Sequence, residues 1–146
     1  MAAGVQLTAE SLEAFAQALD LAVGEIAAPT AFVPSLYLDA ELGFDQLTPS
    51  FLDDLYTLQP FGSGNPEPLF SARRIRVAER RVVGQHHLSM ALIQEEASAS
   101  SPLRAIHFNA DPSEATRDAM DRIAFRARWN YWNSRRSIQL VIAETE

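Results

Sequence analysis

The sequence contains no cysteine and no lysine, and it has no long hydrophobic run. The lack of cysteine excludes a disulfide scaffold, a thiolate zinc site and a cysteine nucleophile. No segment approaches the roughly 18 consecutive apolar residues that a membrane span requires. The N-terminus also lacks the basic start and apolar stretch of a secretory signal. We therefore expect a cytoplasmic protein that has no membrane partner.

Basic residues are absent from the first half of the chain. All twelve are arginines, and the first of them is Arg73. Residues 1–72 contain ten acidic residues, whereas residues 73–146 combine the arginines with nine acidic residues. The net charge of −7 is therefore the sum of an acidic first half and a basic second half. The basic second half favours a polyanionic partner. The alternative is that the arginines are scattered over solvated faces, where they keep edge strands soluble.

The first 59 residues are predicted to be mainly helical. Apolar residues three and four positions apart predict a helix over Ala9–Ile26, and its apolar stripe would pack on a neighbour. Thr48 as N-cap and Pro49 at the first helical position predict a second helix, with Leu58 on its buried face. Between the two helices, residues 36–38 are a candidate for a short strand.

A run rich in proline and glycine follows at residues 60–68. It contains three prolines and two glycines, so it can form neither a helix nor a central strand. The sign of the charge changes at the same place. We therefore predict an N-terminal part at residues 1–59, a junction at 60–68 and a second domain at 69–146.

Beyond the junction the apolar period becomes two, which predicts five half-buried strands. Their inward residues are Ile75 and Val77; Leu88, Met90 and Leu92; Ile106 and Phe108; Ile123, Phe125 and Trp129; and Ile138, Leu140 and Ile142. A polar loop is expected at residues 97–102, and a short helix from Asp111 to about Met120, between strands three and four. This α+β order is that of an oligonucleotide/oligosaccharide-binding (OB) β-barrel, although five-stranded SH3-like barrels and open sheets give a similar pattern.

Arginines and aromatic residues alternate or adjoin near the end of the chain. Guanidinium groups pair with phosphates, and exposed rings stack on bases at roughly 1–3 kcal/mol per base. We expect Trp129 to be a core residue and one of the adjacent pair Tyr131 and Trp132 to be buried. The candidate residues for binding single-stranded nucleic acid are Arg74, Arg76, Arg126, Arg128, Tyr131, Trp132, Arg135 and Arg136.

No arrangement of residues typical of catalysis or metal binding is visible. His86 and His87 are adjacent at a predicted strand start, where neighbouring side chains point to opposite faces, so a turn or surface role is favoured. No serine lies in a Gly-x-Ser-x-Gly turn. The chain is therefore not expected to be a complete enzyme or to hold a cofactor.

The junction and its flanks resemble a known family. Leu58–Phe70 resembles the L-x-P-F-G-x-G-N-P-x-P-x-F junction of RecJ-type single-stranded-DNA exonucleases of the DHH superfamily. Residues 83–88 are similar to the family's V-G-x-x-H-L strand entry, and residues 105–109 to its x-I-x-F-N strand. Residues 130–140 resemble its N-x-aromatic-x-x-x-x-S-(L/I)-Q-L ending, and residues 1–4 the tail of its G-G-H-x-x-A-A-G motif.

The resemblance implies a C-terminal region that consists of the end of a DHH-associated domain, the junction and an OB domain. The parent would be a 5′–3′ exonuclease of DNA recombination and repair, with Mg²⁺ or Mn²⁺ in an N-terminal DHH domain that is missing here. The OB domain would guide single-stranded DNA to that domain. The alternative is a protein-interaction or architectural module that closes the nuclease or docks a single-strand-binding protein or helicase.

Overall fold

The computed structural model describes residues 4–33, 35–95 and 101–146. Most of the predicted loop at 97–102 and of the motif at 1–4 lies outside these ranges. The chain divides into two compact units, Met1–Leu36 and Tyr37–Glu146, and the predicted junction belongs to the second. None of the helices in the described ranges has the length and hydropathy that crossing a bilayer demands.

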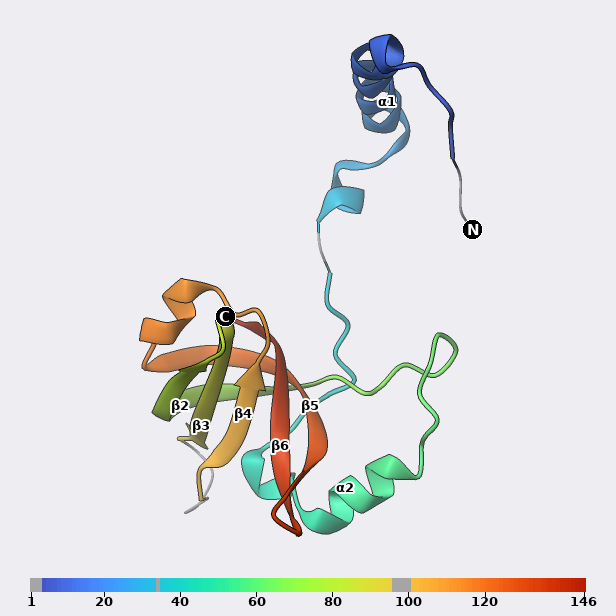
Figure 1. Ribbon diagram of the computed structural model, residues 1–146. Helices are drawn as coiled ribbons and strands as arrows, with labels where there is room; N and C mark the ends of the chain where they lie inside the picture. Colours follow the sequence, from blue (N-terminus) through green and yellow to red (C-terminus); the bar gives the residue numbers. More distant parts are fainter. Residues whose placement is uncertain (1–3, 34, 96–100) are drawn as a thin grey trace. The chain divides into compact units, whose positions relative to one another are not determined.

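The first unit is a single helix with short 3₁₀ turns at its ends. It contains η1 (Ala9–Ser11), α1 (Leu12–Ile26) and η2 (Pro29–Phe32), which Figure 1 draws in blue. The predicted helix is therefore confirmed, with its first turn in the 3₁₀ form. No residue of α1 is buried, so the expected packing of its apolar stripe on a neighbour is not seen within the described residues.

The second unit begins with β1 (Ala40–Glu41), η3 (Phe44–Gln46) and α2 (Pro49–Tyr56). The strand expected at 36–38 is wrong, because the parallel pairing with the start of the next strand uses Ala40 and Glu41 instead. Thr48 caps α2 as predicted, since its hydroxyl accepts a hydrogen bond from the Phe51 N–H at 3.2 Å. Leu58 is 54% exposed because the helix ends before it.

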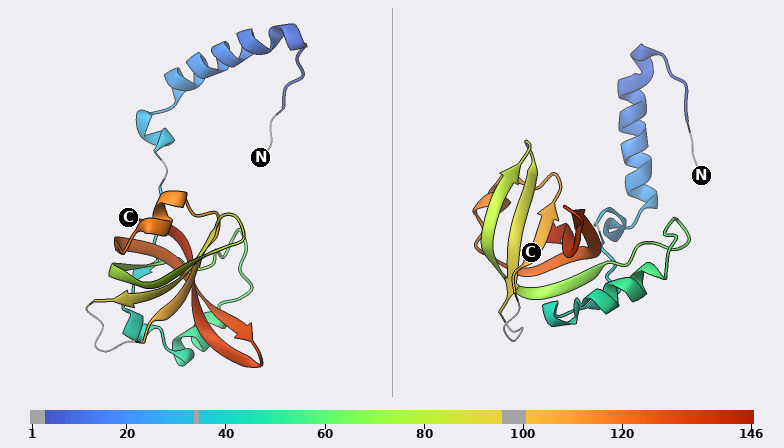
Figure 2. Two further views of the ribbon diagram at one scale, coloured as in Figure 1. Left: turned by 60° about the vertical axis from the view of Figure 1, so that its left-hand side comes forward. Right: turned by 60° about the horizontal axis from the view of Figure 1, so that its bottom comes forward.

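Five longer strands close into a ring (Figures 1 and 2). They are β2 (Phe70–Val83), β3 (His87–Gln94), β4 (Leu103–His107), β5 (Ala119–Trp132) and β6 (Arg135–Thr145). Their order is β2-β3-β4-β6-β5, and β5 pairs back with β2. Only β4 and β6 are parallel within this ring. The predicted OB-type α+β fold is thus confirmed, but β1 makes the described sheet six-stranded instead of five-stranded.

The element between β4 and β5 is shorter than predicted. It is the 3₁₀ helix η4 (Pro112–Thr116), and β5 already begins at Ala119. The Asp111 carboxylate caps η4 by accepting a hydrogen bond from the Ser113 N–H at 2.8 Å. Hydrogen bonds from the Ser113 side chain and backbone lower the pKa of this carboxyl below its ordinary value.

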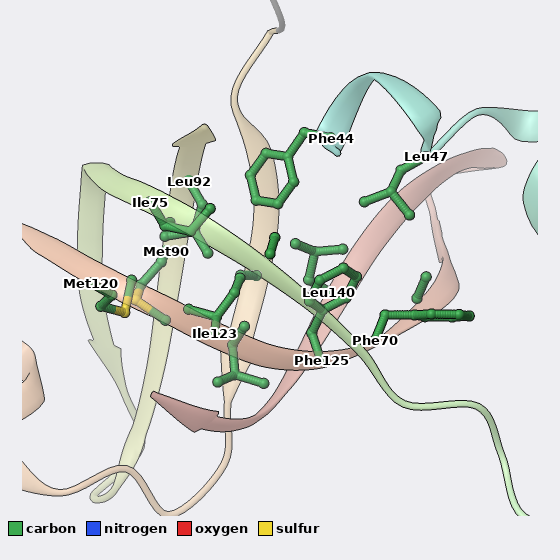
Figure 3. Packing of buried hydrophobic residues seen from close by; sticks show 14 of the residues in the cluster. Phe44, Leu47, Phe70, Ile75, Met90, Leu92, Met120, Ile123, Phe125 and Leu140 are labelled. Carbon is green, nitrogen blue, oxygen red and sulfur yellow. The ribbon is translucent and has the colours of Figure 1, made fainter. Parts of the chain in front are cut away.

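The inner face of the ring is filled by large apolar side chains (Figure 3). Those almost fully enclosed include Ile75, Leu92, Ile123, Phe125 and Leu140, together with Leu52 of α2. The alternation in β4 is opposite to the prediction, since its fully buried residue is Ala105 while Ile106 is half-buried. Phe108, beyond the end of β4, is 52% exposed.

The reason for the shift in β4 lies in its neighbours. Ala105 stands between Met90 of β3 and Leu140 of β6, its partners in the two flanking strands. Because both partners are large and point inward, a methyl group is what fits between them in a close-packed interior.

Candidate nucleic-acid interface

The outer face of the ring carries two rows of side chains that cross five strands. Residues directly opposite each other in paired strands project from the same face. The first row is Arg81, Ser89, Ile106, Val141 and Arg126. The second is Glu79, Ala91, Arg104, Gln139 and Arg128. We call these ten residues the arginine face, because four of them are arginines from β2, β4 and β5.

A groove of about 670 Å³ covers part of this face, between β2 and β6. It is lined by Glu79, Arg80, Arg81, Ser89, Arg104, Asn130 and Gln139. Arg104 was not predicted from the sequence to bind nucleic acid, and Arg81 is not among the eight candidate residues. Only the pairing register, which joins strands distant in sequence, brings Arg104 beside Gln139 and Gln139 beside Arg128.

The β5–β6 hairpin forms a second groove, of about 610 Å³. Its turn residues Asn133 and Ser134 have φ values of 46° and 58°, as a type I′ turn requires. The groove is lined by Asn130, Trp132, Asn133, Arg135, Arg136 and Ser137. Asn130 lines both grooves, so the two adjoin at this residue.

Both aromatic residues near the hairpin turn are exposed, Tyr131 to 68% and Trp132 to 74%. The expectation that one of them is buried is therefore wrong. The last residues of β5 pair only with β6, so no further strand covers this part of the hairpin. The aromatic side chains of Tyr131 and Trp132 are thus both available to stack on a ligand.

Glu67 binds two arginines at one edge of the arginine face. Its carboxylate accepts a hydrogen bond from Arg128 Nε at 2.7 Å and lies 3.5 Å from Arg126 Nε. A further hydrogen bond joins Arg128 Nη2 to the second carboxylate oxygen. Hydrogen bonding to Glu67 raises the pKa of Arg128 above its ordinary value. On the second row, Arg104 Nη1 lies 3.0 Å from the Glu79 carboxylate.

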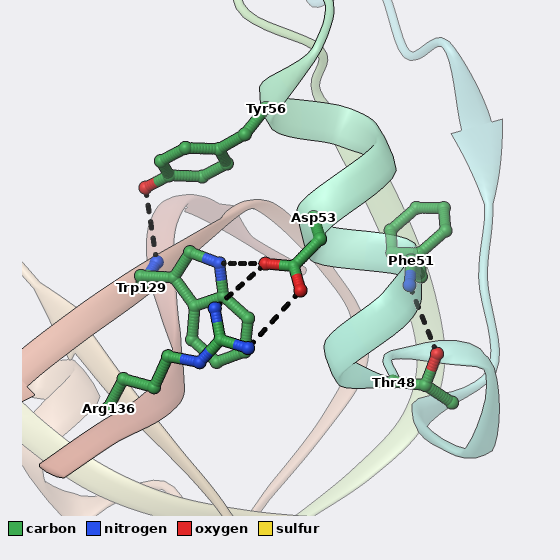
Figure 4. A network of polar contacts seen from close by, with 6 residues as sticks. All are labelled: Thr48, Phe51, Asp53, Tyr56, Trp129 and Arg136. Carbon is green, nitrogen blue, oxygen red and sulfur yellow. Dashed lines mark hydrogen bonds and ion pairs between the residues drawn. The ribbon is translucent and has the colours of Figure 1, made fainter.

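A polar network joins α2 to the base of the hairpin (Figure 4). Asp53 accepts hydrogen bonds from Arg136 at 2.9 and 3.2 Å and from the Trp129 indole at 3.2 Å. The Arg136 guanidinium lies 4.3 Å above the Trp129 ring. Tyr56 completes the network, because its hydroxyl accepts from the Trp129 backbone N–H at 3.3 Å. Trp129 is half-buried and packs against the core, as predicted.

A family model described as "RecJ OB domain" matches residues 38–144 of this chain. The chain belongs to the RecJ OB domain family. The matched region contains both grooves, the carboxylates of Asp53 and Glu67, and all of the strand ring except Thr145, the last residue of β6. The resemblance inferred from the junction motif is therefore confirmed.

Relatives extend the RecJ OB domain match over nearly the whole chain. Single-stranded-DNA-specific exonuclease RecJ of Dickeya dadantii is 30% identical over an alignment 146 residues long, which covers 97% of this chain and 24% of the relative. The Bacillus subtilis protein of the same name is 26% identical over 99% of this chain and 18% of its own length. The chain thus spans about a quarter or less of these relatives.

Solved structures agree on the fold of the RecJ OB domain. Crystal structures of Thermus thermophilus RecJ in complex with Mg²⁺ and with Mn²⁺ superpose with TM-scores of 0.72 and 0.74. Each is 21% identical to this chain, which covers 20% of the matched protein. Coverage of this chain is 95% in the first comparison and 98% in the second.

In this RecJ OB domain the eight predicted binding residues fall into three groups. Arg126 and Arg128 lie on the arginine face but line neither groove. Trp132, Arg135 and Arg136 line the hairpin groove, and Tyr131 is exposed on the same hairpin. Arg74 and Arg76 lie on β2 and line neither groove. Within the part of the chain that the structure describes, Arg81 and Arg135 form no ion pair.

Proposed function

We propose that the two grooves form one binding path for single-stranded DNA. The observation that carries this proposal is that Asn130 lines both grooves, so that they adjoin. The path offers guanidinium groups at Arg81, Arg104 and Arg135 and an exposed ring at Trp132. Phosphates would pair with the arginines and bases would stack on the Trp132 indole, so binding would depend little on base sequence.

In the whole protein, we propose, the RecJ OB domain guides the strand to a catalytic DHH domain of a 5′–3′ exonuclease. The names of the two relatives, single-stranded-DNA-specific exonuclease RecJ, support the single-stranded-DNA substrate and the exonuclease class of the whole protein. The described residues contain no group of three or more His, Asp or Glu that fits a metal ion. We therefore assign Mg²⁺ or Mn²⁺ chemistry, and a part in DNA repair and recombination, to the parent protein and derive no catalytic step from these residues.

The salt dependence of DNA binding tests the proposed path. The chain is titrated against a fluorescein-labelled oligothymidylate at several salt concentrations. Each phosphate neutralised on a single strand contributes about −0.7 to the slope of log K against log salt. Arg81→Gln and Arg135→Gln should each make the slope shallower by about that amount. Arg73→Gln is the matched control, because Arg73 lies outside both grooves and pairs with Glu41 at 2.9 Å.

A flat salt response, or no binding at low salt, would contradict the proposal. It would favour the second candidate, a module that contacts a nuclease domain, a single-strand-binding protein or a helicase. The pairing of Arg104 with Glu79 and of Arg80 with Asp118 supports this candidate, since these carboxylates neutralise part of the basic surface. In that case Arg81→Gln and Arg135→Gln would leave DNA binding unchanged.

A further inference from the structure

Glu67 occupies the β5 end of the arginine face. Its carboxylate engages Arg128 with both oxygens and Arg126 with one. A phosphate group would present the same kind of acceptor to the same guanidinium forks. Arg126 and Arg128 are both among the residues predicted from the sequence to bind nucleic acid.

The backbone on both sides of Glu67 is held in place. Pro66 and Pro68 flank it, and each proline ring fixes its own φ angle. The Asn65 side chain donates to the carbonyl oxygens of Leu58 at 2.8 Å and of Pro60 at 3.1 Å. On the other side, the Leu69 N–H donates to Asp39 Oδ2 at 2.8 Å. Glu67 is therefore presented to the arginines at little cost in backbone entropy.

We propose that Glu67 is an internal competitor for phosphate, so that DNA reaches Arg126 and Arg128 by displacing its carboxylate. This inference rests on the proposed binding of single-stranded DNA in the two grooves, and it extends that binding to the β5 end of the arginine face, where Arg126 and Arg128 lie. Exchange of one anion for another weakens binding relative to an open site, because the DNA must break existing hydrogen bonds. The junction that carries Glu67 would then set the affinity of the whole face.

The exposure of the three side chains allows such an exchange. Arg126 is 34% exposed, Arg128 48% and Glu67 20%, so all three are accessible to solvent at the edge of the face. Ion pairs of this kind add little to stability because solvent screens them. A phosphate can therefore replace the carboxylate without disrupting the packed interior of the ring.

The variant Glu67→Gln tests the exchange. It keeps the shape of the side chain and removes its charge. We expect oligothymidylate affinity at low salt to rise about fivefold, as expected for removing one close surface charge. The slope of log K against log salt should steepen by about 0.7 for each phosphate newly neutralised. Glu41→Gln is the control, because it removes the same charge from a pair with Arg73, and neither residue is among the ten of the arginine face.

The background variant Arg126→Gln/Arg128→Gln identifies the route of the effect. In that background Glu67→Gln should change neither affinity nor slope. The exchange would be contradicted if Glu67→Gln lowered the DNA affinity or left it unchanged, or if Glu41→Gln raised the affinity by the same factor. If the unmodified chain binds DNA and Arg81→Gln weakens this binding while Glu67→Gln does not change it, the proposed exchange is wrong and the proposed function is supported. If neither the unmodified chain nor any variant binds DNA at low salt, both the exchange and the proposed function are wrong. Thermal unfolding of each variant checks that the fold is kept.

Discussion

Arg136 of β6 and Asp53 of α2 form a two-pronged ion pair, with nitrogen–oxygen distances of 2.9 and 3.2 Å. The same guanidinium covers the Trp129 ring, and the same carboxylate accepts from the Trp129 indole. The pair therefore joins a helix before the junction to the hairpin that ends the sheet. Arg135, next to Arg136 in sequence, has no such partner among the described residues.

Arg135→Gln and Arg136→Gln should have different effects. We expect Arg135→Gln to make the salt slope of DNA binding shallower by about 0.7 and to leave stability unchanged. Arg136→Gln should leave the slope nearly unchanged and lower the free energy of unfolding by up to about 1 kcal/mol, since a half-exposed ion pair is lost. Anisotropy titrations and urea unfolding measure the two quantities. Equal losses of slope would show that Asp53 does not hold Arg136 away from DNA.

Trp132→Ala should weaken DNA binding by the loss of one stacking platform. Stacking contributes about 1–3 kcal/mol per base, which corresponds to a loss of roughly five- to 150-fold in affinity. Phe108→Ala is the control, because Phe108 is 52% exposed, packs edge-on against His87 and lines neither groove. Comparable losses in both variants would refute a specific role for Trp132.

Ser134→Gly should stabilise the hairpin. Ser134 has a φ of 58°, in the left-handed region that glycine adopts without steric cost, and Asn-Gly is the preferred type I′ pair. We expect a gain of about 0.5–1 kcal/mol in urea unfolding. Ser137→Gly on the neighbouring strand should instead destabilise, because glycine loses more entropy there. A loss of stability in Ser134→Gly would argue against this turn geometry.

The cap of η4 should be sensitive to acid. Hydrogen bonds from Ser113 lower the pKa of Asp111, so the folded chain favours the ionised carboxyl. Its contribution is therefore fully present above about pH 4, the ordinary value for aspartate, and is lost as the pH falls through the lowered folded value. The melting temperature of Asp111→Ala should lie below that of the unmodified chain at pH 7, and the gap should close towards pH 2. A gap that stays constant with pH would contradict this cap.

Local features of the fold could be predicted from the sequence. Alternation located the five ring strands, because each inward residue needs only its own strand to be recognised. The cap at Thr48 and the helix at Ala9–Ile26 are equally local. The inward position of Ala105 could not be predicted, since it depends on Met90 and Leu140 in neighbouring strands.

The candidate site was predictable only in its composition. The pattern indicated arginines and rings near the C-terminus, but grouping Arg81 with Arg104 requires the strand register. The carboxylates of Asp53 and Glu67 lie 83 and 61 positions before Arg136 and Arg128, respectively. The apolar periodicity of a single strand or helix cannot predict contacts between residues so far apart in the sequence. Exposure of both Tyr131 and Trp132 likewise follows from how far β5 extends beyond its pairing with β2.

The closure of the ring has a consequence for association between copies of the chain. Each of the strands β2, β3, β4, β5 and β6 has a partner on both sides. The unpaired edges of strands are common templates for aggregation of folded proteins, and closing a sheet into a ring pairs these edges. Over its paired length the sheet therefore offers no backbone ladder to a neighbouring molecule, whereas the end of β5 beyond Phe125, which pairs only with β6, keeps one unpaired edge.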